Sequence, residues 1–227
     1  MEDSLLGAPT PPLPLESNPK FGWWRFVHAY SFLTGGVTFL IGTWVLEPFT
    51  SDNAAQSNSL AGLSSALYTL GSLGFLLVDV LEFFTFPNAL LRVNIALSML
   101  GSAFYVAGSL GFAPAVAGAA PALGSLGFLV GSALIGGSLA WMVARVRAAP
   151  AQPPPHPPAD APLALGVEAG AGAGATFFLA GTALYWLRGW TAGPGYACVL
   201  WLWAVGSAAF TAGGACLWLR HYRLGLA

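Results

Sequence analysis

The sequence predicts an all-α fold, a polytopic membrane bundle of six transmembrane helices, and three observations support this class. Of the 227 residues, 56% are hydrophobic and only 7% are charged, whereas about a quarter of the residues of a soluble protein are charged. Six apolar segments reach the roughly 20 residues that a helix needs to cross the hydrocarbon core of a bilayer. Each segment also carries a copy of one short glycine-containing motif.

The six predicted spans leave no long stretch for a soluble domain. A proline-rich run, Pro153 to Pro158, favours extended chain and cannot continue a helix. No basic leader precedes an apolar core at the start of the chain, so we expect no cleavable signal peptide. The predicted spans are 26–46, 62–84, 89–112, 122–144, 163–187 and 196–219. The predicted organisation is a Pro-rich cytoplasmic segment (1–22), a four-helix membrane unit (23–147), a Pro-rich cytoplasmic linker (148–162), a two-helix membrane unit (163–220) and a short cytoplasmic tail (221–227).

The positive charges predict the orientation of these spans. Arg188 is the one basic residue on the side opposite the two termini, and an excess of Lys and Arg marks the cytoplasmic side of a membrane protein. We therefore expect both termini in the cytoplasm. The net charge of −1, with its basic residues spread singly, gives no surface for nucleic acid. The basic residues on the side of the termini are Lys20, Arg25, Arg92, Arg145, Arg147, Arg220 and Arg223.

The repeated motif consists of a glycine, a small residue, an aromatic at the fifth position and, in most copies, a small pair at the eighth and ninth. Gly35 to Thr43 is one copy, and Gly206 to Gly214 is another. At about 100° per residue the glycine, the aromatic and the pair share one stripe of a helix. Small residues let membrane helices approach closely, so we expect an aromatic ring of one helix to fill a glycine notch on its neighbour. The predicted packing glycines are Gly35, Gly42, Gly71, Gly101, Gly108, Gly124, Gly131, Gly174, Gly181, Gly206 and Gly213.

The second span departs from this pattern by carrying Asp79 where the other spans have a small residue. Glu82 lies one turn later on the same stripe. If the motif glycines of neighbouring spans lie at one depth, His28 and Asn94 reach a similar level toward the cytoplasmic side. His28, Asp79, Glu82 and Asn94 are therefore the candidate ion or proton site, because ionisable residues inside a membrane are expensive and tend to be paired.

Three interpretations of this site remain open. It could be a hydrogen-bonded clasp that sets helix register, or a proton or cation pathway, since imidazole titrates near neutral pH. It could also be a metal or haem site, because His28 and His221 lie toward the same membrane side. We predict no metal site and no cofactor. Glu168 enters the fifth span on the flank of its stripe and is a peripheral member at most.

Short phrases in the first two spans, Phe39 to Thr43 and Tyr68 to Phe75, resemble the YrhK-like family of small uncharacterised membrane proteins. The resemblance implies a membrane hairpin unit of uncharacterised activity, with no catalytic residues to carry over. No motif for covalent catalysis or zinc binding is present, so we do not expect an enzyme. We expect an integral membrane scaffold or accessory subunit, with a proton- or cation-coupled channel or transporter as the alternative. Its expected partners are the lipid bilayer and either another membrane protein or a second copy.

Overall fold

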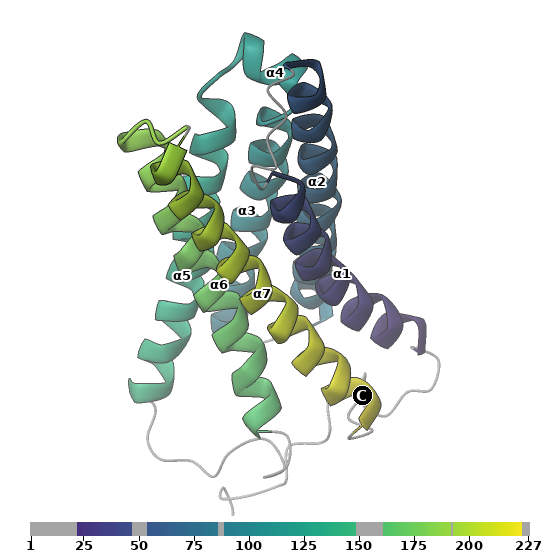
Figure 1. Cartoon of the computed structure of the whole chain (residues 1–227). Coiled ribbons are helices and arrows are strands. Elements are labelled where there is room, and N and C mark those ends of the chain that lie inside the picture. Colours follow the sequence, from purple (N-terminus) through teal and green to yellow (C-terminus); the bar gives the residue numbers. More distant parts are fainter. Residues whose placement is uncertain (1–21, 47–53, 86–88, 149–160, 192, 224–227) are drawn as a thin grey trace, which may run out of the picture.

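The computed structural model describes residues 22–46, 54–85, 89–148, 161–191 and 193–223, which contain seven helices and no strand (Figure 1). Six helices are long and apolar enough to cross a membrane. The chain is therefore a multi-pass membrane protein, and the predicted fold class is confirmed. The helices are α1 (Gly22–Leu46), α2 (Ala54–Thr85), α3 (Ala89–Gly111), α4 (Pro114–Ala119), α5 (Leu123–Ala148), α6 (Ala161–Leu187) and α7 (Gly193–Arg223).

Several helix boundaries differ from those predicted. Helix α2 begins at Ala54, eight residues before the predicted span, and α7 runs from Gly193 to Arg223. The short helix α4 was not predicted; it has a proline in its first turn, where the missing amide hydrogen costs nothing. The predicted Pro-rich segments, 1–22 and 148–162, lie almost entirely outside the described residues, so the domain boundaries stay a prediction.

The six long helices form a closed ring. Neighbours in the chain pack as three antiparallel pairs, α1 with α2, α3 with α5 and α6 with α7. The pairs join through contacts of α2 with α3, α5 with α6 and α1 with α7. Helix α1 begins and α7 ends at the same end of the bundle, here called the termini end (Figure 1). The last contact, between the first and the last helix, therefore closes the ring.

The axis of the ring is filled with aromatic side chains. The motif aromatic of every long helix points inward, and none of the six is more than 4% exposed. Rings from helices on opposite sides of the bundle meet: the centroids of Phe39 and Phe128 lie 6.1 Å apart, and those of Tyr105 and Phe210 lie 6.3 Å apart. The predicted inward stripe is thus correct in all six spans. The motif aromatics are Phe39, Phe75, Tyr105, Phe128, Phe178 and Phe210.

Two of the three helix pairs exchange aromatic rings and glycine notches reciprocally. A Cβ atom at Gly35 would lie 2.5 Å from the ring of Phe75, and one at Gly71 would lie 2.5 Å from the ring of Phe39. The same exchange joins α6 and α7, where Gly174 faces Phe210 and Gly206 faces Phe178. A side chain at these positions would push the helices apart.

The third pair, α3 with α5, uses a different notch. Phe128 lies against Gly108 and Tyr105 against Gly131, which are the second glycines of their motifs. This pair is therefore slid by seven residues, about two turns, relative to the other two pairs. Of the other predicted packing glycines, Gly101, Gly124, Gly181 and Gly213 are also closely packed. Gly42 is the exception, because its nearest neighbours would be at an ordinary 3.4 Å from a Cβ.

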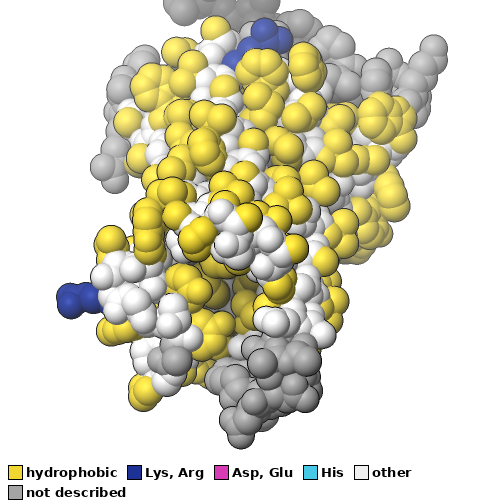
Figure 2. Space-filling model, turned by 90° about the horizontal axis from the view of Figure 1, so that it is seen from above, with side chains coloured by type: hydrophobic (Ala, Val, Ile, Leu, Met, Phe, Trp, Pro, Cys, Tyr) yellow, Lys and Arg dark blue, Asp and Glu magenta, His cyan; other side chains and the backbone are white. Residues whose placement is uncertain are grey.

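The outer surface of the bundle is apolar. Figure 2 looks down on the end opposite the termini end, where hydrophobic side chains are mixed with other groups. Large exposed side chains such as Ile41, Leu70, Leu100 and Trp201 come from different helices and are 47–62% exposed. Such a belt suits lipid rather than water.

Candidate functional site

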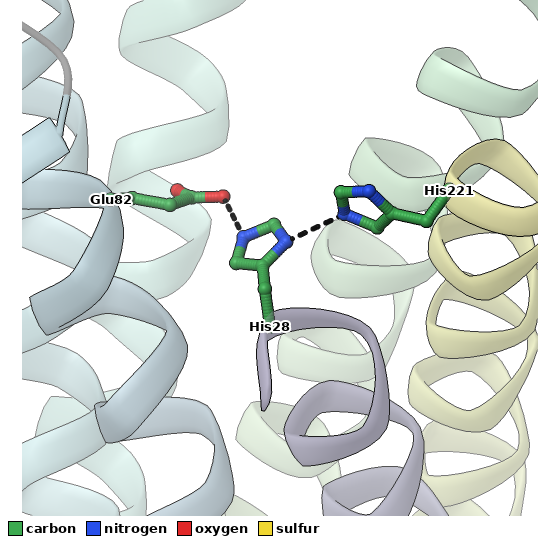
Figure 3. Close-up of polar contacts among 3 residues, drawn as sticks. All are labelled: His28, Glu82 and His221. Atoms are coloured by element: carbon green, nitrogen blue, oxygen red, sulfur yellow. Dashed lines mark hydrogen bonds and ion pairs between the residues drawn. The ribbon is translucent and has the colours of Figure 1, made fainter. Parts of the chain in front are cut away.

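A continuous chain of hydrogen bonds joins three helices at the termini end (Figure 3). Nε2 of His28 lies 2.8 Å from a carboxylate oxygen of Glu82, and Nδ1 of the same ring lies 3.0 Å from Nε2 of His221. His28 comes from α1, Glu82 from α2 and His221 from α7. We call these three residues the His–Glu chain. His28 is its centre, because both of its ring nitrogens are used.

The His–Glu chain is shielded by an aromatic residue of α1. The indole of Trp24, one turn before His28, stacks on the His28 ring with centroids 4.5 Å apart and meets the edge of the His221 ring. His28 and His221 are only 4% and 8% exposed, whereas the Glu82 side chain is 30% exposed. The two imidazoles are thus buried, and the carboxylate has access to the surroundings of the bundle.

Further charged groups lie around Glu82. The carboxylates of Asp79 and Glu168 are close enough to interact electrostatically with that of Glu82. Glu168 also interacts with Arg220, which precedes His221 on α7. Glu168 was expected to be peripheral at most, and it does lie outside the hydrogen-bonded chain, yet it contributes charge from α6.

Asp79 faces α3 rather than His28. Its carboxylate accepts a 2.6 Å hydrogen bond from the hydroxyl of Ser102. The same seam carries a second polar contact, in which the Ser72 and Ser109 hydroxyls lie 3.1 Å apart. The corresponding residue of α1, Thr43, contacts Ser207 of α7 at 3.3 Å. Asp79 therefore occupies a position that hydroxyl residues fill elsewhere, and it serves there to join two helix pairs.

Asn94 does not join the His–Glu chain either. Its side chain is buried, 9% exposed, and its amide oxygen has no hydrogen-bond partner. Of the four predicted site residues, the structure thus brings His28 and Glu82 into direct contact and leaves Asp79 and Asn94 apart from them.

The stagger of the helices explains this outcome. The prediction assumed that the motif glycines of neighbouring helices lie level. In α1 and α2, however, each glycine lies against the aromatic four residues further along its partner, an offset of about 6 Å. The residue of α2 level with His28 is therefore Glu82, one turn beyond Asp79. On α3 it is Ser102 that lies level with Asp79, so Asn94, eight residues earlier in the sequence, lies about two turns closer to the termini end.

His221 was missed as a member of the site. The sequence suggests it only as a second haem ligand, and no motif relates it to His28. Its direct bond to His28 uses the nitrogens that an ion between them would need. Among the described residues, no group of three or more His, Cys, Asp or Glu side chains is placed to hold a metal ion.

Comparisons with family models, curated proteins and solved structures give no match to this chain. The YrhK-like resemblance therefore stays a prediction, and the function has to be argued from the geometry.

Proposed function

We propose that this protein is a membrane scaffold or accessory subunit whose work is done by its packed helices. The observation that carries the proposal is the aromatic filling of the bundle axis. Rings from opposite helices are in contact, including Tyr68 and Phe178 at 6.2 Å. Water and ions need a polar path through a membrane protein, and contact between rings across the axis leaves no room for one at this level.

The packing between helices supports the same role. Reciprocal ring-and-notch contacts, as between Gly206 and Phe178, depend on close approach of the backbones. A closely packed interior transmits strain and resists sliding. Hydrogen bonds between hydroxyl groups, such as the 2.7 Å bond between Thr43 and Tyr68, satisfy polar side chains inside the bundle. These properties suit a rigid body that holds another membrane protein, or a second copy, in position.

We place both termini in the cytoplasm. Arg25, Arg92 and Arg220 lie near helix ends at the termini end, whereas Arg188 follows α6 at the other end. That asymmetry agrees with the positive-inside rule. Three antiparallel pairs with related motifs also support the idea that the chain repeats a hairpin unit similar to the YrhK-like family. We propose no catalytic activity.

Proton transfer is a second candidate, and the His–Glu chain favours it. Neutral imidazole can accept a proton on one nitrogen and release one from the other, so His28 could pass protons between His221 and Glu82. This path covers only the termini end, and the aromatic axis separates it from the opposite side.

A pair of experiments tests the scaffold proposal. Liposomes that contain the purified protein should take up no more protons than empty liposomes when a pH gradient and a membrane potential are applied. After native membranes are mildly solubilised, the chain should migrate as part of a particle that is larger than the detergent-solubilised monomer. Proton flux that disappears in Glu82→Gln would replace the proposal by the transport alternative. A purely monomeric chain would contradict the scaffold role.

The particle can be tested with matched variants. Gly206→Leu places a large side chain against Phe178 and should disperse the particle, because the α6–α7 pair must separate. Gly136→Ala is the control, since nothing lies within 4 Å of a Cβ at that position. Equal behaviour of the two variants would show that the packing of the bundle is irrelevant to assembly.

A further inference from the structure

The His–Glu chain is the point where the ring of helices closes at the termini end. It joins the first helix to the last across 193 residues of sequence. Elsewhere the interface between α1 and α7, here called the α1–α7 seam, is held by contacts between groups that do not gain or lose protons. A Cβ at Gly36 would lie 2.5 Å from the backbone nitrogen of Thr211, and Thr43 contacts Ser207 further along. Titratable side chains therefore hold the seam at the termini end, and backbone and hydroxyl contacts hold it further along.

The bond between the two imidazoles depends on how many protons they carry. With both rings neutral, Nδ1 of His28 accepts from the Nε2–H of His221, and Nε2–H of His28 donates to Glu82. One added proton keeps the bond: a cationic His28 donates from Nδ1 to a neutral His221, and still donates to Glu82. A second added proton removes every acceptor, because two N–H groups then face each other across the 3.0 Å gap.

Burial makes this doubly charged state expensive. Both rings are less than 9% exposed, so water cannot replace the lost bond or screen the two cations unless the helices separate. The six motif aromatics, here called the aromatic layer, lie further from the termini end. On α1 and α7 they are Phe39 and Phe210, each eleven residues from the histidine of its own helix, or about 16 Å along the helix. Movement at the termini end therefore does not require the aromatic layer to unpack.

We infer that His28, His221 and Glu82 form a proton-dependent latch, which holds α7 against α1 at the termini end and releases it when both imidazoles become cationic. The ends of the two helices that carry His28 and His221 then separate, while the contact of Gly36 with Thr211 and that of Thr43 with Ser207 hold the rest of the seam. The inference does not rest on the scaffold role, because opening is a change of shape that needs no partner.

Other charged groups around the latch influence the pH at which it opens, but they cannot act as the latch themselves. Asp79 and Glu168 add negative charge next to Glu82. Arg220 lies beside His221 in sequence and interacts with Glu168. Arg92 of α3 lies over the ring of Phe83, and Arg25 lies one turn before His28 on α1. Arginine stays charged throughout the pH range in which imidazole titrates, so none of these three arginines can act as the switch.

Distance measurements between spin labels test the latch in the full chain in lipid nanodiscs. In a background with Cys198→Ser and Cys216→Ala, one label pair replaces Phe26 and Tyr222, which are exposed near the termini end of α1 and α7. A second pair replaces Ile41 and Val205, which are exposed on the same helices toward the other end.

Between about pH 8 and about pH 5, where histidine titrates, the first distance should lengthen reversibly by roughly 1–2 Å or more, the size of helix shifts at packed interfaces. The second distance should stay constant. A first distance that does not change with pH would overturn the inference, and so would equal lengthening of both pairs.

Histidine variants identify which side chain causes the pH-dependent lengthening. His221→Gln keeps a hydrogen-bonding side chain but cannot become a cation, so the lengthening should be lost. His156→Gln removes the third histidine of the chain and should leave the response unchanged. The inference fails if His221→Gln opens like the wild type, or if His156→Gln abolishes opening.

Discussion

Substituting Gly36 by alanine should loosen the α1–α7 seam, and the structure allows the effect to be estimated. The new Cβ would lie 2.5 Å from the nitrogen and 2.6 Å from the Cα of Thr211. Both are backbone atoms, so no side chain can rotate away and the helices themselves must separate. Overpacking of this kind costs about 1–3 kcal/mol.

Gly136→Ala is the matched control, because it lies inside a helix but meets nothing within 4 Å. Alanine favours a helix over glycine by up to about 1 kcal/mol at either position. That gain cancels in the comparison, and the difference between the two variants isolates the close contact. Gly36→Ala should therefore be less stable than Gly136→Ala by about 1–3 kcal/mol.

Thermal unfolding of the two variants in the same detergent measures this difference. At about 2–4 °C per kcal/mol for a chain of this size, the midpoint of Gly36→Ala should lie roughly 2–12 °C below that of Gly136→Ala. Equal midpoints, or a more stable Gly36→Ala, would refute the close contact between α1 and α7 and with it the closed ring.

Three further substitutions test other parts of the bundle by the same unfolding measurement. Phe39→Ala should lower stability by about 3–5 kcal/mol, because it empties the centre of the aromatic layer; a loss below about 1 kcal/mol would mean that the axis is not filled as described. Ser102→Ala should cost about 1–3 kcal/mol by leaving the buried Asp79 carboxylate without this donor, and Ser102→Thr, which keeps the hydroxyl, should restore most of it. Asn94→Leu should leave stability unchanged or raise it by about 1 kcal/mol, since the amide oxygen has no partner to lose; a clear loss would reveal a contact of Asn94 that the packing does not indicate.

The fold could be predicted because its signals are local. Twenty apolar residues specify a span wherever they occur, and the spacing of Gly35, Phe39 and Thr43 within one helix is enough to show which face turns inward. The aromatic layer follows from that face alone. The short helix α4 was missed because six residues carry no periodic signal.

The site could be predicted only in part, because it depends on how helices slide past one another. One motif offers two glycine notches, and α1–α2 uses the first while α3–α5 uses the second. Each choice moves a polar residue by whole turns, which decided that Glu82 rather than Asp79 meets His28. The contact with His221 depends on ring closure between the first and last helices, for which the sequence has no short-range signal.

Ring closure by α1 and α7 also has a consequence for biogenesis. Helix α1 enters the bilayer early in synthesis, yet the histidine that bonds to Nδ1 of His28 is 193 residues further along the chain. At about 5–20 residues per second, a ribosome needs roughly 10–40 s to supply it. During that interval the seam-facing side of α1 is open to lipid or to whatever insertion factor holds it, so the nascent protein acquires its final shape only with its last helix.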